Sequence, residues 1–197
     1  MLKKGAMFGL DARIALAIFG VLSVISGAAL YSAIQESKVT QQLAQIKEIE
    51  KAIEQYILDT GSMVPFSASV PTADLSIAAL VEKPTGVTGW NGPYLSLEKG
   101  TGDYLNRQNK AGKTYALTYS VTGDWTAVSS SKNCKQSSAS CSVYILHISD
   151  LDFQENFEKK LDGAGTANYL TGNFRESIGH LYFKTNIPFD PSSSPNT

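Results

Sequence analysis

The chain has 197 residues, enough for one domain and a short extension. Its 17 Lys and Arg residues nearly balance its 18 Asp and Glu residues, so the net charge is −1. Without an overall positive field to attract phosphates, nucleic acid is excluded as a predicted partner. The two Cys and two His residues leave little material for a classical zinc site, which usually needs about four such ligands.

An apolar run without a single charged side chain covers residues 14–34. As a helix rising about 1.5 Å per residue, it would be roughly 31 Å long, which matches the hydrocarbon core of a bilayer. Lys3, Lys4 and Arg13 lie on its N-terminal side, with Asp11 as the acid there. This charge bias predicts a single span with the N-terminus in the cytoplasm and the remaining chain outside the inner membrane.

The same helix is predicted to continue through residues 35–58, because no Pro or Gly occurs before Gly61. Apolar residues recur there with the i, i+3, i+4, i+7 spacing of an amphipathic helix: Val39, Leu43, Ile46, Ile49, Ala52, Ile53, Tyr56 and Ile57. We therefore predict one helix from Asp11 to Leu58, ended by the glycine. The alternative is a signal peptide cut among the small residues 26–29, which has no reason to continue in phase into a structural helix.

The remaining sequence predicts a small α+β head. Residues 113–121 alternate as a strand does, and residues 125–128 are the expected return strand of a hairpin. Residues 142–148 are apolar on both faces, which is typical of a central strand. Further elements are expected over residues 73–81 (helix), 149–161 (helix) and 181–183 (strand). The predicted fold class is α+β, with the long helix packed on an antiparallel sheet. The turn residues 90–93 are expected to form a loop that wedges Trp90 against the helix.

Cys134 and Cys141 lie in a polar loop of a head that is predicted to be exported, and we expect them to form a disulfide. The closed loop is short, so the expected stabilisation is roughly 2–3 kcal/mol. Six residues separate the two cysteines, whereas redox motifs have two.

No catalytic motif is present: the sequence contains neither a Gly-rich phosphate loop nor a Gly-x-Ser-x-Gly elbow. His147, Asp150 and Asp152 could surround a metal, but a histidine at the core edge with capping carboxylates is the simpler interpretation. A calcium site built from Asp150, Asp152 and Asp162 has suitable oxygen ligands, although nothing in the spacing requires it. We predict no enzyme activity and no cofactor.

Several segments, scattered from the N-terminus to residue 175, each match a different part of one known family's sequence. They are the basic leader Lys3-Lys4-Gly5, the helix end Gln55–Gly61, the segments Leu80–Pro84 and Gly89–Leu95, and the later stretches Glu158–Gly163 and Thr171–Arg175. The combination resembles type IV pilins and, over residues 80–95, the major pseudopilin of type II secretion. Membership of this prepilin family implies a filament subunit that waits in the inner membrane. Its partners would be copies of itself, related pilin-like subunits, a prepilin peptidase and the assembly machinery.

The resemblance implies removal of the leader, after Gly5 or after Gly9. Family members usually carry a Glu at the fifth mature position, whereas these cleavages place Asp11 sixth or second. Asp11 is the candidate to pair with a neighbour's N-terminal amine and set the axial register between subunits. The alternative is that Asp11 caps the start of the helix.

Small residues in the apolar run favour close packing between helices. Gly20 and Gly27 are seven residues apart, which places them on the same side of a helix. The family's calcium-binding loop, which follows the Tyr-Leu pair, is not recognisable in residues 96–107.

The predicted organisation is a leader (1–9), an apolar membrane or filament-core helix (10–34), its amphipathic continuation (35–61), a head (62–187) and a loose tail (188–197). The primary functional prediction is a structural subunit of a type IV pilus-like or type II secretion pseudopilus-like filament, with the head periplasmic or extracellular. A single-span anchored extracytoplasmic binding protein that does not polymerise is the alternative, and an exported enzyme is a third hypothesis.

Overall fold

The computed structural model describes residues 7–68, 74–107, 113–121, 141–149, 173–177, 180–188 and 190. The chain divides into two compact units, residues 1–41 and 42–197.

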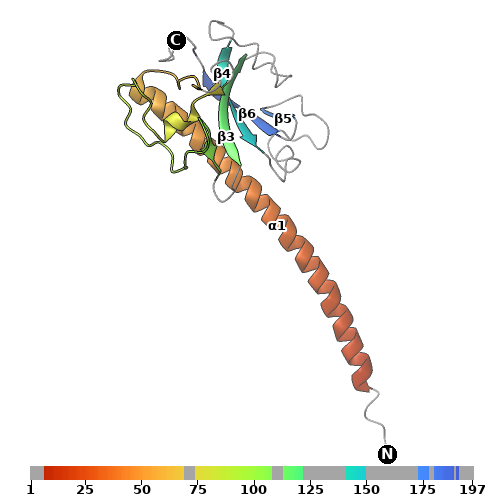
Figure 1. The fold of residues 1–197 in the computed structure, drawn as a ribbon. Coiled ribbons are helices and arrows are strands. Elements are labelled where there is room, and N and C mark those ends of the chain that lie inside the picture. The colour runs from red at the N-terminus through yellow and green to blue at the C-terminus, as the bar shows by residue number, and fades with distance from the viewer. Residues whose placement is uncertain are drawn as a thin grey trace, which may run out of the picture. The chain divides into compact units, whose positions relative to one another are not determined.

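Helix α1 (Met7–Thr60) is continuous and is the first element of the chain (Figure 1). Its end follows the predicted chemistry: Gly61 adopts a φ of 66°, and its N–H donates to the Ile57 carbonyl at 2.9 Å. A glycine in the left-handed conformation just after the last turn is a common way to satisfy the final carbonyls of a helix. The prediction of one long helix ended by this glycine is confirmed, with ends slightly beyond the predicted ones.

Within the described residues, the head contains a six-stranded antiparallel sheet. Its strands are β1 (Asp74–Leu75), β2 (Leu105–Asn106), β3 (Thr114–Val121), β4 (Cys141–Ser149), β5 (Phe174–Ser177) and β6 (His180–Pro188). The order is β1-β3-β4-β6-β5, and β2 also pairs with β3. Strand β4 therefore lies in the centre, as its two apolar faces predicted (Figure 1).

The core of the head lies between the sheet and residues 42–60 of α1. On the helix, the predicted stripe is buried at Ile46, Ile49, Ala52, Ile53 and Tyr56. The sheet contributes buried side chains from its two central strands: Tyr115 and Leu117 on β3, and Tyr144, Leu146 and Ile148 on β4. This confirms the predicted α+β arrangement of a long helix with a small antiparallel sheet.

The prediction of a helix over residues 73–81 is wrong. Asp74 and Leu75 form β1, and only Ile77–Leu80 is helical, as a short 3-10 turn (η1). The backbone of Leu75 pairs with Leu117 on β3 and bridges to Phe66, so its hydrogen-bonding groups are engaged in the sheet. Pairing with distant residues overrode the local helical pattern.

Other boundaries also differ from the sequence-based expectations. Ser149 ends β4, where it pairs with His180, and so does not begin a helix. Strand β6 is longer than the predicted strand over residues 181–183, and β5 was not predicted. The return strand at 125–128 and residues 150–161 of the predicted helix lie outside the described residues, and β3 pairs with β4.

Candidate functional site

The first candidate surface is the apolar part of α1. Twelve large apolar side chains between Leu10 and Ile34 are each between 45% and 72% exposed. Within the described residues, one helical stretch, Gly9–Thr60, is long and apolar enough to cross a membrane by length and composition. Its most apolar window has a mean hydropathy of 2.2, and no part of that window is buried within the chain.

The predicted site residues of this helix are all solvent-facing. Asp11 lies within α1, four residues after Met7, which is the first residue that the structure describes. Arg13 follows two residues later and therefore points to a different side of the helix. A Cβ atom added at Gly20 or at Gly27 would meet no atom within 4 Å. These positions are open for contact with another molecule, and their roles stay predictions.

The second feature is the loop of residues 89–95, which carries the Trp-Asn-Gly-Pro-Tyr motif and which we call the Trp90 loop. The Trp90 Nε1–H donates to the Ala79 carbonyl at 2.8 Å. The Trp90 ring meets the Tyr94 ring edge-on, and Tyr94 meets Tyr56 of α1 edge-on, with centroids 5.7 and 5.9 Å apart. The contact with α1 is therefore made by Tyr94, whereas the predicted wedge placed Trp90 itself against the helix.

Gly89 brings the backbone of the Trp90 loop directly onto the end of α1. A Cβ at Gly89 would overlap the Asp59 carbonyl oxygen at well under 3.0 Å, and the φ of Gly89 is 77°. Both the space and the backbone conformation therefore require glycine here. The motif that carries the family resemblance therefore packs against the last turn of α1 and joins it to the head.

A buried polar network, which sequence reasoning missed, joins α1 to β3. The Tyr115 hydroxyl donates to Gln45 Oε1 at 2.7 Å and accepts a bond from the Gln42 amide. The other end of that amide, Gln42 Oε1, accepts from Arg107 Nη2 at 2.9 Å. Gln42 and Arg107 are only 5% and 6% exposed, and the guanidinium lies 5.9 Å from the Tyr115 ring centroid. Buried polar groups of this kind are costly when unpaired, so the network fixes how helix and sheet meet.

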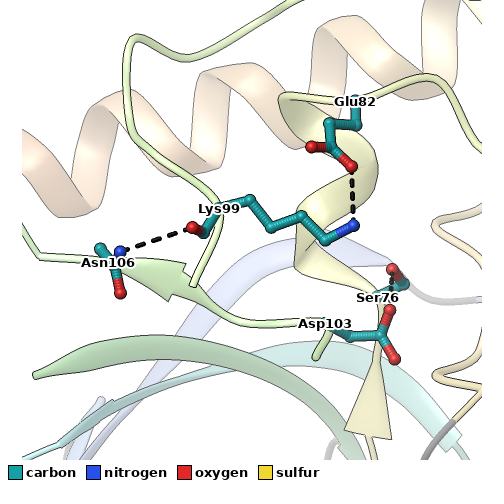
Figure 2. Close-up of polar contacts among 5 residues, drawn as sticks. All are labelled: Ser76, Glu82, Lys99, Asp103 and Asn106. Atoms are coloured by element: carbon teal, nitrogen blue, oxygen red, sulfur yellow. Dashed lines mark hydrogen bonds and ion pairs between the residues drawn. The ribbon is translucent and has the colours of Figure 1, made fainter. Parts of the chain in front are cut away.

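The turn of residues 96–107 is tied to other segments of the head by polar contacts (Figure 2). Lys99 Nζ lies 2.6 Å from Glu82 Oε2. The two carboxylate oxygens of Asp103 accept hydroxyl hydrogen bonds from Ser67 at 2.6 Å and from Ser76 at 2.8 Å.

Asp74 lies beside that turn and accepts a hydrogen bond from the Tyr104 hydroxyl at 3.1 Å. Burial raises the pKa of the Asp74 carboxyl, and the neighbouring Asp103 charge raises it further, against the hydrogen bond from Tyr104, which lowers it. No group of three or more His, Cys, Asp and Glu side chains in the described part of the chain is arranged to hold a metal ion.

The remaining site predictions fall largely outside the described residues. This applies to Gly5, Cys134, Asp150, Asp152 and Asp162, and to the side chain of Cys141, whose backbone begins β4. Gly9 lies within α1. His147, considered as a metal ligand, instead stacks on Tyr182 of β6, with centroids 4.7 Å apart and an 11° interplanar angle.

Comparison with known proteins gives one family match. Residues 29–116 match the model of the family described as "Type II secretion system (T2SS), protein G". No curated protein and no solved structure matches the chain. The match covers the second half of α1, the Trp90 loop, the 96–107 turn and the start of β3. Together with the long apolar helix and the small antiparallel sheet, it supports placing this chain in the pilin-like, pseudopilin family.

Proposed function

We propose that this chain is a structural subunit of a type II secretion pseudopilus-like filament, assembled through the apolar part of α1. The observation that carries the proposal is the row of exposed apolar side chains between Leu10 and Ile34. Covering what remains exposed of each side chain is worth about 1 kcal/mol, so the row represents on the order of 10 kcal/mol. That equals the whole stability of a typical domain, so lipid or other copies of the helix must cover this surface.

The membrane covers this surface before assembly. Lys3, Lys4 and Arg13 place the N-terminus in the cytoplasm, and the head then lies on the outer side of the inner membrane. A prepilin peptidase removes the leader after Gly5 or Gly9, and the assembly machinery lifts the subunit into the filament. The family match supports this sequence of events, and the partners are copies of the chain and related pseudopilins.

Packing between helices supplies specificity in the filament. Lipid is as apolar as the helix surface, so helices gain by close contact, interhelical hydrogen bonds and lipid entropy. Gly20 and Gly27 leave open space on one side of α1, which allows a neighbouring backbone to approach. Asp11, exposed in the second turn, pairs with a neighbour's N-terminal amine and sets the axial register.

A pair of matched variants tests the proposal. Gly27→Leu fills the open side, whereas Ala29→Leu adds a similar volume about 200° around the helix. We expect Gly27→Leu to reduce the number of filaments seen by negative-stain microscopy and Ala29→Leu to leave them near the wild-type number. Equal filament numbers in all three proteins would refute close packing at Gly27.

Intact mass of the membrane-extracted protein tests processing in the same samples. The expected mass lacks the leader, and it also reports an N-methyl group and the loss of two protons in a disulfide between Cys134 and Cys141. An intact leader combined with no filaments would favour the anchored, non-polymerising binding protein. A mature chain that begins beyond Ala29 would lack most of the apolar helix and would overturn the proposal.

A further inference from the structure

We infer that α1 has two complementary sides through which copies of this chain pack side by side in the bilayer, each helix displaced by two residues from the next. Each side carries a charge of one sign at both ends of the apolar run. The acidic side consists of Asp11, Ile18, Ile25 and Glu36, and the basic side consists of Arg13, Gly20, Gly27 and Lys38. The inference rests on the part of the proposed function that places residues 10–34 in the membrane, and it does not depend on filament assembly.

The first observation is that both sides follow the helix with the same spacing. Along each side the steps are 7, 7 and 11 residues. Seven and eleven residues are close to two and three whole helical turns, so the four members of a side share one face of α1. Every member of the basic side comes two residues after a member of the acidic side, which places the two sides about 200° apart.

The second observation is that the charges of the two sides match at one displacement. Asp11, Arg13, Glu36 and Lys38 are exposed, and they are the charged side chains of residues 10–41. If the basic side of one helix faces the acidic side of a parallel neighbour displaced by two residues, about 3 Å, Arg13 lies level with the neighbour's Asp11. The same displacement places Lys38 level with Glu36. Two pairs of opposite charge, about 37 Å apart along the helix, therefore agree on one register.

The third observation is that the shapes match at this same displacement. Gly20 lies level with Ile18 of the neighbour, and Gly27 lies level with Ile25. Ile18 and Ile25 are 55% and 60% exposed, and a Cβ atom at either glycine would meet no atom within 4 Å. Each isoleucine can therefore fill the space beside a glycine, which is the close contact that helices in lipid need in order to associate.

The small displacement suits helices that share one membrane. Copies in the same bilayer lie at the same depth, because the apolar run of each copy spans the hydrocarbon core. A displacement of about 3 Å keeps the charged ends of every copy at the two interfaces. Because two different sides meet, the contact repeats from one copy to the next, and it predicts rows of subunits as well as pairs.

Cysteine cross-linking of the full chain in phosphatidylcholine vesicles, without assembly proteins, tests the register. One protein carries Ile18→Cys with Gly20→Cys, and its matched control carries Ile25→Cys with Gly20→Cys. In the control the two cysteines of neighbouring helices lie about 10 Å apart along the axis, which is beyond the reach of a disulfide. Above the yield of the protein without added cysteines, we expect at least about fivefold more cross-linked product in the first protein, with trimers and larger species. Equal yields in the two proteins would overturn the inference.

Charge reversal in the first cysteine protein tests the ion pairs. We expect Lys38→Glu to lower the cross-linked yield about two- to fivefold, because it then faces Glu36 of the neighbour. Adding Glu36→Lys to Lys38→Glu exchanges the two charges and should restore most of the yield. Lys47→Glu, a matched reversal at an exposed position of α1 outside both sides, should leave the yield unchanged. Failure of the exchange to restore the yield, or an equal loss in Lys47→Glu, would overturn the pairing of charges.

The vesicle experiment separates this inference from the proposed filament. A chain that does not float with the vesicles would overturn both, because residues 10–34 would not enter a bilayer. Wild-type filaments without the expected cross-links would overturn the side-by-side contact alone. The expected cross-links in a chain that forms no filaments would support the contact and refute the filament subunit.

Discussion

Gly89→Ala should destabilise the protein by disturbing the contact between the Trp90 loop and the end of α1. The substitution introduces two costs. An alanine at a φ of 77° costs about 1–2 kcal/mol, because L-residues disfavour the left-handed region. The new Cβ would also overlap the Asp59 carbonyl oxygen, and opening that contact in a packed region costs about 1–3 kcal/mol more. The expected loss in free energy of unfolding is therefore about 2–5 kcal/mol.

Gly86→Ala is the matched control. Gly86 also has a positive φ, 81°, but a Cβ there meets no atom within 4 Å. This variant should therefore lose only the conformational part, about 1–2 kcal/mol. The difference between the two variants isolates the contact between the Trp90 loop and the helix end.

Urea denaturation of the full chain in detergent, followed by tryptophan fluorescence, measures both losses. The Tyr94 ring links Trp90 to Tyr56, so the emission of Gly89→Ala should also change before unfolding. If Gly89→Ala is no less stable than Gly86→Ala, the loop backbone does not contact the helix end. The conclusion that the Trp90 loop holds the last turn of α1 against the head would then be refuted.

Three further changes test the polar interior of the head. Tyr115→Phe removes the hydroxyl that bonds the buried Gln42 amide, so we expect urea denaturation to show a loss of about 1–3 kcal/mol. Tyr56→Phe should stay within about 0.5 kcal/mol of wild type, because the Tyr56 hydroxyl is buried with no hydrogen-bond partner among the described residues. A larger loss for Tyr56→Phe than for Tyr115→Phe would contradict both assignments. Burial raises the pKa of the Asp74 carboxyl, so the folded state holds this proton more tightly, and stability falls as pH rises from 3.8 through the raised pKa. The Asp74→Asn side chain stays neutral and can still accept a hydrogen bond from Tyr104. Thermal melts should therefore show Asp74→Asn to be more stable than wild type at neutral pH but not at acid pH. If the difference in Tm between the two proteins is the same across this range, the raised pKa of Asp74 does not affect stability.

Local patterns in the sequence were sufficient for α1. The stripe that includes Ile46, Ile53 and Tyr56 follows from helical periodicity, and the stop follows from one glycine in the left-handed conformation. Strand β4 was also predictable, because a run that is apolar on both faces needs cover on both sides. These features depend on residues close in sequence, whose spacing determines which face is buried.

Features that depend on distant residues were not predictable. Asp74 and Leu75 look like the start of a helix, and only their pairing with β3 makes them a strand. The Arg107–Gln42 and Gln42–Tyr115 bonds join residues 65 and 73 positions apart, and nothing near Gln42 distinguishes it from the other polar positions of the helix. The Trp90 loop was predictable as a turn because a single segment carries it, whereas its contacts with α1 through Tyr94 and Gly89 were not.

The two parts of α1 differ in what covers their apolar side chains. In residues 42–60 the head covers the apolar stripe, so Ile53 and Tyr56 are fully buried. In residues 10–34 the apolar side chains face outward all round, and the chain itself does not cover them. When the helix moves from lipid into the proposed bundle of helices, the apolar side chains of residues 10–34 stay out of water. Burial of apolar area therefore contributes little to the free energy of assembly. What distinguishes the bundle from lipid must then be shape and charge. The open side at Gly20 and Gly27 and the carboxylate of Asp11 are therefore where changes should affect assembly while membrane anchoring persists.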